Sequence, residues 1–307
     1  MRRRGSALKI STVALSGLML AGCSGSGGGE PEAPPPISLQ QYDTTLAGAV
    51  DPLQTALKGL AAAKAYKGLE GRVKAVEGAA DQAVTELTDI APPVELAAEH
   101  TQLVTALEAF HEELGGVSSQ VDQRALCTGS AVRSGLGNAK ATAGLHEALV
   151  AVSGKLPGDP PPLTLPAAGQ KLGARPENGK ILRGGKLDGE GELTIKNGGS
   201  DAVVTLSRKG KTTASVFVRK DKQATVKGVP DGSYTVFFTS GVGWDGKVRA
   251  FGRNCSFQRS EKKSEFVTTA PTSTTPGSRT VFTYTLYAVV GGNAPTKDVD
   301  PGDFPDS

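Results

Sequence analysis

The sequence is poor in the residues on which most catalytic and metal sites depend. Of its 307 residues, three are histidine, three are cysteine and one is tryptophan. All three histidines lie within residues 38–153, so residues 189–290 offer no base for a Ser-His-Asp triad. Neither paired carboxylates nor a cluster of metal ligands stands out at a useful spacing. The sequence therefore predicts that the protein is not an enzyme and that it holds no metal and no cofactor.

Half of a di-iron carboxylate motif is present among the histidines. Glu108 and His111 have the Glu-x-x-His spacing, which occurs twice in such bundles and is completed by two further glutamates. His100 and His146 have no glutamate three residues before them. We therefore expect the histidines to be solvated or capping side chains.

The uncharged stretch at residues 10–21 is too short to span a bilayer. It has 12 residues, whereas a membrane-spanning helix needs about 20. It follows a segment, residues 1–9, that carries four positive charges, and this order is typical of a secretory signal. The run Leu20-Ala21-Gly22-Cys23 comes next and resembles a lipobox, the processing site of bacterial lipoproteins.

The resemblance to a lipobox implies a lipid anchor on Cys23. A diacylglyceryl group is added to the thiol, and signal peptidase II recognises Leu20, Ala21 and Gly22 and cuts before Cys23. Residues 1–22 are then a signal peptide, and palmitate-type acyl chains hold the mature protein on the extracytoplasmic face of the cell membrane. The alternative is an ordinary signal-peptidase site followed by an incidental cysteine.

Composition and periodicity divide the remaining chain into segments. Residues 23–37 are rich in Gly, Ser and Pro and predict a flexible tether, and residues 154–188, with six prolines and seven glycines, predict a linker. Between and after them we predict a multidomain fold. An all-α up-and-down helical bundle in residues 38–153 precedes an all-β antiparallel sandwich in residues 189–290, and residues 291–307 form a C-terminal tail.

Apolar residues within the first of these domains recur every three or four positions, which is typical of helices. The pattern predicts four helical segments, which cover residues 39–60, 69–87, 96–114 and 121–152. We expect the third to end at Gly115-Gly116 and the fourth to be broken near residues 135–137. Short connections predict that neighbouring helices are antiparallel, as in a four-helix bundle.

The period changes to two in the second domain, which favours strands. Candidate strands cover residues 192–196, 202–206, 214–219, 223–229, 233–239, 247–251, 255–259, 265–269 and 279–289. The stretch from Lys227 to Val236 resembles the hairpin of prealbumin-like, carboxypeptidase-regulatory-like sandwich domains, with a turn at residues 230–232 and Tyr234 pointing inward. The wider domain looks like an uncharacterised bacterial surface domain of that type. This resemblance implies a structural or adhesive module without catalytic residues.

Two motifs in this domain match functional signatures only in their letters. Residues 241–246 read G-x-G-x-x-G, but a dinucleotide-binding loop must be followed by a helix, and residues 247–251 alternate like a strand. Ser260 and Lys263 have the S-x-x-K spacing of a nucleophile motif, which requires a helix N-terminus rather than a site between strands. We therefore predict neither activity.

Cys127 and Cys255 remain once Cys23 carries lipid, one in each predicted domain. Two thiols outside the cytoplasm tend to oxidise, so an interdomain disulfide is one alternative. The other is a pair of free thiols buried in separate cores, with Cys127 in a helix. Trp244, the only tryptophan, is either an exposed platform for a ligand or a loop anchor packed on the edge of the sandwich.

The small net charge of +3 conceals two regions of opposite sign. Residues 38–153 carry a net charge of −6, and residues 189–297 carry +8. The basic runs at residues 208–211 and 219–222 fall at predicted turns, where they are either solvated or in contact with anionic wall polymers. No nucleic-acid recognition module is visible. The sequence thus predicts a structural or interaction role at the cell envelope, with a protein or wall polymer as partner. The alternative is a lipoprotein that captures a small ligand.

Overall fold

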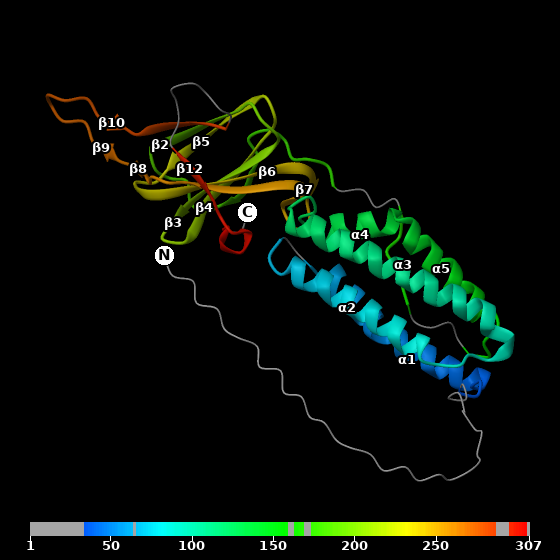
Figure 1. The fold of residues 1–307 in the computed structure, drawn as a ribbon. Coiled ribbons are helices and arrows are strands. Elements are labelled where there is room, and N and C mark those ends of the chain that lie inside the picture. Colours follow the sequence, from blue (N-terminus) through cyan, green and yellow to red (C-terminus); the bar gives the residue numbers. More distant parts are fainter. Residues whose placement is uncertain (1–33, 64–65, 159–162, 169–172, 287–294, 306–307) are drawn as a thin grey trace, which may run out of the picture. The chain divides into compact units, whose positions relative to one another are not determined.

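A computed structural model of the chain describes residues 34–63, 66–158, 163–168, 173–286 and 295–305. Within these residues five α-helices precede a half of the chain in which antiparallel sheets dominate (Figure 1). The prediction of an α-helical half followed by a β-structured half is therefore confirmed. The signal peptide, the lipobox and Cys23 lie outside the described residues.

The helices are joined by short connections. They are α1 (Leu39–Ala61), α2 (Leu69–Thr88), α3 (Ala97–Asp122), α4 (Gly129–Asn138) and α5 (Lys140–Ser153), with a short 3-10 helix at Val94–Leu96. Ser38 starts α1 with a capping box, in which its side chain accepts from the Gln41 N–H and the Gln41 side chain accepts from the Ser38 N–H. Helix α2 lies between α1 and α3, and α5 packs on α3 (Figure 1).

The three-and-four spacing of apolar residues builds the core of this half. Tyr42, Leu46, Leu53 and Leu60 follow one face of α1 and are fully buried, as is Phe110 of α3. Each such side chain contributes about 1.5–3 kcal/mol by leaving water. This burial, rather than intrinsic helix propensity, holds the helices together.

The end predicted for the third helix is wrong. Helix α3 continues through Gly115 and Gly116 to Asp122. Each glycine costs about 1 kcal/mol in a helix interior. Val117 and Val121 lie beyond them on the buried face, and their burial offsets this cost because each contributes about 1.5–3 kcal/mol.

The fourth segment, predicted at residues 121–152, begins too early, because residues 121–122 end α3 and residues 123–128 form a loop. The rest of it is two helices, and the break between them lies slightly later than predicted. Helix α4 ends at Asn138, and Ala139 has an extended backbone (φ −74°, ψ 140°) before α5 begins. The structure therefore has five α-helices in its described residues, where the sequence suggested four.

The strands form one large and two smaller sheets among the described residues. They are β1 (Ile181–Gly184), β2 (Gly191–Asn197), β3 (Ala202–Arg208), β4 (Lys211–Val218), β5 (Lys222–Val229), β6 (Gly232–Asp245), β7 (Ala250–Ser260), β8 (Ser264–Phe266), β9 (Thr268–Thr269), β10 (Ser278–Arg279), β11 (Val281–Thr285) and β12 (Thr296–Asp298). The large sheet has the order β1-β4-β3-β6-β7-β12, with β8 beside β6. The smaller sheets are β11-β2-β5 and β10-β9.

Two details of strand pairing differ from the prediction. Strand β11 pairs with β2 in parallel rather than antiparallel register. Strands β5 and β6 flank the predicted turn at residues 230–232 but belong to different sheets, so they do not form a hairpin. Tyr234 is fully buried as expected, and its hydroxyl donates to the Pro230 carbonyl at 2.9 Å, which fixes the chain where it crosses between the sheets.

One hydrophobic cluster joins the two main sheets. Leu193 and Ile195 of β2 contribute to it from the three-stranded sheet, and Val204, Val216 and Val236 contribute from the large sheet. A second, smaller cluster contains side chains of the large sheet and two cysteines, Cys127 from the helical half and Cys255 from the β-structured half. That smaller cluster marks the place where helices and strands meet.

Candidate functional site at the disulfide junction

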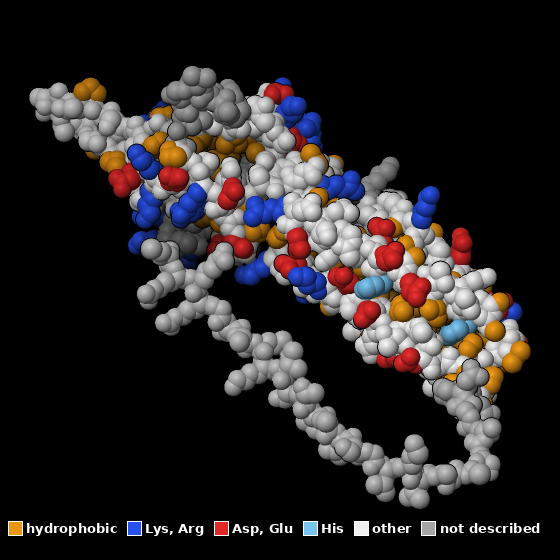
Figure 2. All heavy atoms as spheres, viewed as in Figure 1, with side chains coloured by type: hydrophobic (Ala, Val, Ile, Leu, Met, Phe, Trp, Pro, Cys, Tyr) orange, Lys and Arg blue, Asp and Glu red, His pale blue; other side chains and the backbone are white. Residues whose placement is uncertain are grey.

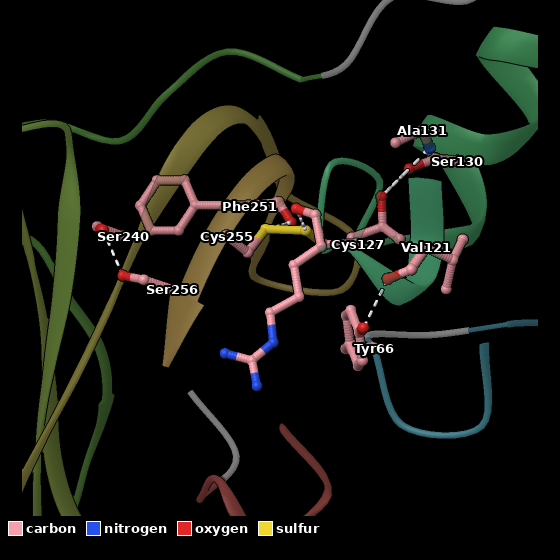
Figure 3. Close-up of a disulfide and its surroundings, with 11 residues drawn as sticks. Tyr66, Val121, Cys127, Ser130, Ala131, Ser240, Phe251, Cys255 and Ser256 are labelled. Carbon is pink, nitrogen blue, oxygen red and sulfur yellow. Dashed lines mark hydrogen bonds between the residues drawn. A yellow bond between two sulfur atoms is a disulfide. The ribbon is translucent and has the colours of Figure 1, made fainter. Parts of the chain in front are cut away.

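A disulfide joins the helical and the β-structured halves. Cys127 lies in the loop between α3 and α4, not in a helix as predicted, and Cys255 lies on β7 (Figure 3). Their Cα atoms are 6.5 Å apart, and both residues are buried. Of the two alternatives that the sequence left open, the structure therefore has the disulfide rather than two thiols in separate cores.

Backbone hydrogen bonds reinforce this connection. The Cys127 N–H donates to the Gly252 carbonyl at 2.8 Å, and the Asn254 and Cys255 N–H groups donate to the carbonyls of Ala125 and Arg124 at 3.2 and 3.0 Å. Residues 124–127 thus pair with β7 around a single antiparallel bridge between Leu126 and Arg253. A strand edge that would otherwise expose free N–H and C=O groups is covered by the loop between two helices.

Trp244 is buried at this junction and is not an exposed platform for a ligand. Its side chain is 4% exposed, and its ring packs edge-on against Phe217 and Phe251 with centroids 5.0 and 5.2 Å away. It lies on β6 rather than in a loop. The exposed-platform alternative is therefore wrong, because the indole is buried and packs against the two phenylalanines.

Asp245 connects the start of α4 to the turn between β6 and β7. The carboxylate is buried, and its Oδ2 accepts a hydrogen bond from the Ser130 hydroxyl. Its Oδ1 accepts from the backbone N–H of Lys247 at 3.0 Å and of Val248 at 3.4 Å. These bonds replace the start of the predicted strand at residues 247–251 with a turn, and β7 begins only at Ala250.

A cavity of about 570 Å³, called here the junction cavity, opens beside the disulfide. Its walls come from the loop before α2, strand β1, the β6–β7 turn and the C-terminal segment after β12. Four lining side chains are cationic, and none of the described lining residues is Asp or Glu; the four are Lys67, Arg183, Lys247 and Arg249. Sequence reasoning missed this site because its residues come from distant segments, and only the composition of the β-structured half pointed to positive charge.

The histidines do not assemble a metal site among the described residues. His100 is buried, and its Nδ1 is 3.0 Å from the Tyr42 hydroxyl in a hydrogen bond, so the expectation of a solvated or capping side chain is wrong for this residue. His146 is exposed on α5. In the described part of the chain no three His, Cys, Asp or Glu side chains gather as metal ligands would.

Acidification is expected to destabilise the fold through His100. Burial lowers the pKa of His100 below its ordinary value of 6.5, so near that pH the unfolded chain takes up a proton that the folded chain does not. The free energy of unfolding should therefore fall as the pH drops below 6.5, while this group contributes no pH dependence above it. Denaturant titrations over this range should show a weaker pH dependence in His100→Gln than in the original chain.

The matched control for this measurement is His146→Gln, because His146 is exposed. That variant should keep the pH dependence of the original chain. Equal slopes in the original chain and in His100→Gln would contradict the prediction.

The remaining motif residues have structural positions. Residues 241–246 lie at the end of β6 and the start of the following turn, and β7 rather than a helix comes next. The Ser260 side chain is buried and accepts a hydrogen bond from the Val236 N–H at 3.2 Å. The basic runs at residues 208–211 and 219–222 lie at the β3–β4 and β4–β5 turns. Neither the G-x-G-x-x-G motif nor the S-x-x-K motif therefore has the local structure that its signature requires.

Comparison with known proteins adds no assignment. No protein-family model, curated protein or solved structure matches the chain. Among the described residues, no helix combines the length and apolarity that crossing a bilayer would take.

Proposed function

We propose that this chain is a non-catalytic lipoprotein of the bacterial cell envelope, anchored by lipid on Cys23, whose folded part contacts another envelope component. The observation that carries the proposal is the Cys127–Cys255 disulfide. Disulfides persist in oxidising compartments and are rare in the cytosol. The disulfide thus agrees with the export signal and lipobox in the first 23 residues, which support the location independently.

The proposal includes a β-sandwich of prealbumin-like type for the β-structured half. The hydrophobic cluster shared by the two main sheets and the inward-pointing Tyr234 support it. Domains of this architecture are usually structural or adhesive modules, which suits an interaction role. Figure 2 shows Lys and Arg side chains more frequent over the strands and acidic side chains scattered over the helices. The positive half suits an anionic wall polymer as partner.

Three polar groups that could suggest chemistry are engaged in holding the fold. His100 is paired with Tyr42, Asp245 connects a helix to a turn, and Ser260 accepts from a strand backbone. These roles support a non-catalytic protein. The second candidate function is capture of a small ligand for a transporter or enzyme, and the junction cavity favours it because 570 Å³ lies within the range of small-molecule sites.

Co-sedimentation with isolated cell walls tests the leading proposal. The full chain in detergent micelles should sediment with walls at low salt and return to the supernatant at high salt, because screening weakens contacts of the positive half with anionic polymers. A matched wall sample stripped of its anionic polymers should retain much less protein. Protein that stays in the supernatant with intact walls, together with a thermal shift on addition of a small metabolite, would favour ligand capture instead.

A further inference from the structure

We infer that the junction cavity binds an anionic saccharide, meaning a sugar unit that carries a phosphate or carboxylate group. This inference rests on the proposed envelope function and names the site and the ligand chemistry for it. The sugar unit has two conceivable sources, a free sugar phosphate or a repeating unit of an anionic wall polymer. The chemistry that recognises both is the same.

The charge of the cavity is the first reason. Lys67, Arg183, Lys247 and Arg249 line it, and no carboxylate among the described residues does so. Neither lysine forms an ion pair with any described residue. Like charges held side by side repel one another, and an anion between Lys67 and Lys247 would relieve that repulsion. Arginine in particular presents a planar fork that matches phosphate and carboxylate oxygens.

The fold holds the backbone at Lys247 and the side chain of Arg249 in place. Asp245 holds the turn that carries Lys247 through the two backbone N–H groups that it accepts. Arg249, in the same turn, has a left-handed backbone (φ 53°), and its Nη1 donates to the Leu182 carbonyl at 2.8 Å. That bond uses one of the five guanidinium N–H groups and places the side chain beside β1, where Arg183 lies. A site fixed before binding loses less entropy when the ligand arrives.

Aromatic rings form the apolar part of the same cavity. Tyr66, Phe257 and Phe304 line it and are partly exposed. The Tyr66 ring is 5.8 Å from that of Phe257, which is 5.3 Å from that of Phe304, and the Tyr66 hydroxyl is held by the Val121 carbonyl at 2.6 Å. Rings beside cations suit a ligand with an apolar C–H face and a charged group. A sugar phosphate or a uronic acid has both, whereas inorganic phosphate has only the charge.

The cavity also depends on the junction between the two halves. Cys127 lines it, and Tyr66 and Lys67 reach it from the helical half while Lys247 and Phe257 reach it from the strands. Reduction of the disulfide removes the covalent part of this junction and leaves its hydrogen bonds. Binding should therefore weaken on reduction, which a surface patch of basic residues on the strands alone would not show.

Calorimetry with glucose 1-phosphate and glucuronate tests the inference on the full chain in detergent micelles. At least one of these probes should bind about tenfold more tightly than either glucose or inorganic phosphate. Trp244 gives a second readout, because its ring contacts Phe251 in the cavity wall. The double variant Lys67→Gln/Lys247→Gln should lose about tenfold in affinity, and Lys67→Glu/Lys247→Glu should lose more.

The control is Lys262→Glu/Lys263→Glu, which changes the charge by the same amount in the exposed turn between β7 and β8. It should bind the probes like the original chain.

Purified anionic wall polymer that competes with the bound probe identifies the polymer as the source, and failure to compete identifies the free sugar. Equal binding of glucose, equal binding of inorganic phosphate, or equal losses in the cavity and control variants would overturn the inference. If walls co-sediment with all variants alike, only the cavity assignment fails, and if the original chain does not co-sediment, the proposed function fails.

Discussion

Replacement of both Cys127 and Cys255 with alanine is expected to lower the free energy of unfolding by about 2–5 kcal/mol. The disulfide closes a loop of 128 residues, and chain-entropy arguments give about 5 kcal/mol for a loop of that length. The effect comes mainly from the unfolded chain, which gains freedom when the link is absent. Guanidinium denaturation of the full chain in detergent micelles, followed by Trp244 fluorescence, would measure it.

Reductant provides the control for this experiment. It should destabilise the original chain by a similar amount and leave the double alanine variant unchanged, because that variant has no disulfide to break. Alkylation gives an independent check, since the unfolded, unreduced mature protein should offer no reactive thiol. Two labelled thiols per chain, at Cys127 and Cys255, would contradict the prediction.

Replacement of Cys23 with alanine is expected to abolish attachment of lipid and to leave the precursor uncleaved. The variant lacks the thiol that accepts the diacylglyceryl group, so labelling with radioactive palmitate should be lost and the precursor should escape signal peptidase II. Each buried methylene contributes about 0.8 kcal/mol, so loss of two or more acyl chains removes a firm anchor. The double variant Cys127→Ala/Cys255→Ala should remain labelled and membrane-bound. A Cys23→Ala chain that is still labelled and processed would refute the lipobox interpretation.

The helical half was largely predictable because apolar residues recur every three or four positions along most of it. The spacing of Leu46, Leu53 and Leu60 leaves one buried face at helical period, and no other structure places them together. The end of α3 was not predictable from Gly115 and Gly116 alone, because a local glycine preference of about 1 kcal/mol competes with distant burial. The sequence shows the local cost of the two glycines but not the burial that offsets it.

The strands were predictable and their partners were not. Alternation located β2 to β5 well, but β6 continues past its predicted end to Asp245, and the strands predicted at residues 247–251 and 255–259 are the single strand β7. Alternation also carries no information on which strand lies beside which. The turn at residues 230–232 was correctly placed, yet the chain uses it to pass from one sheet to another rather than to form a hairpin. The choice depends on where Tyr234 can be buried, which is a property of both sheets together.

The candidate site shows the same limit more strongly. Both cysteines were singled out, but the backbone pairing of residues 124–127 with β7 gives no pattern in the sequence. The cations of the junction cavity range from Lys67 to Arg249, and only folding brings them together. The buried role of His100 was missed because its partner Tyr42 is 58 residues away.

The disulfide makes residues 127–255 a covalent ring, and that ring changes what a protease can do to the protein. A single cut anywhere inside the ring, including residues 154–188 between helices and strands, opens it but separates nothing. The β-structured half remains bonded through Cys255 to Cys127 and hence to the helices that precede Cys127. Release of this half from the N-terminal helices therefore requires a second event, either reduction of the disulfide or a cut outside the ring. The protein would in this way keep its two halves bonded after a cut in the segment that joins them.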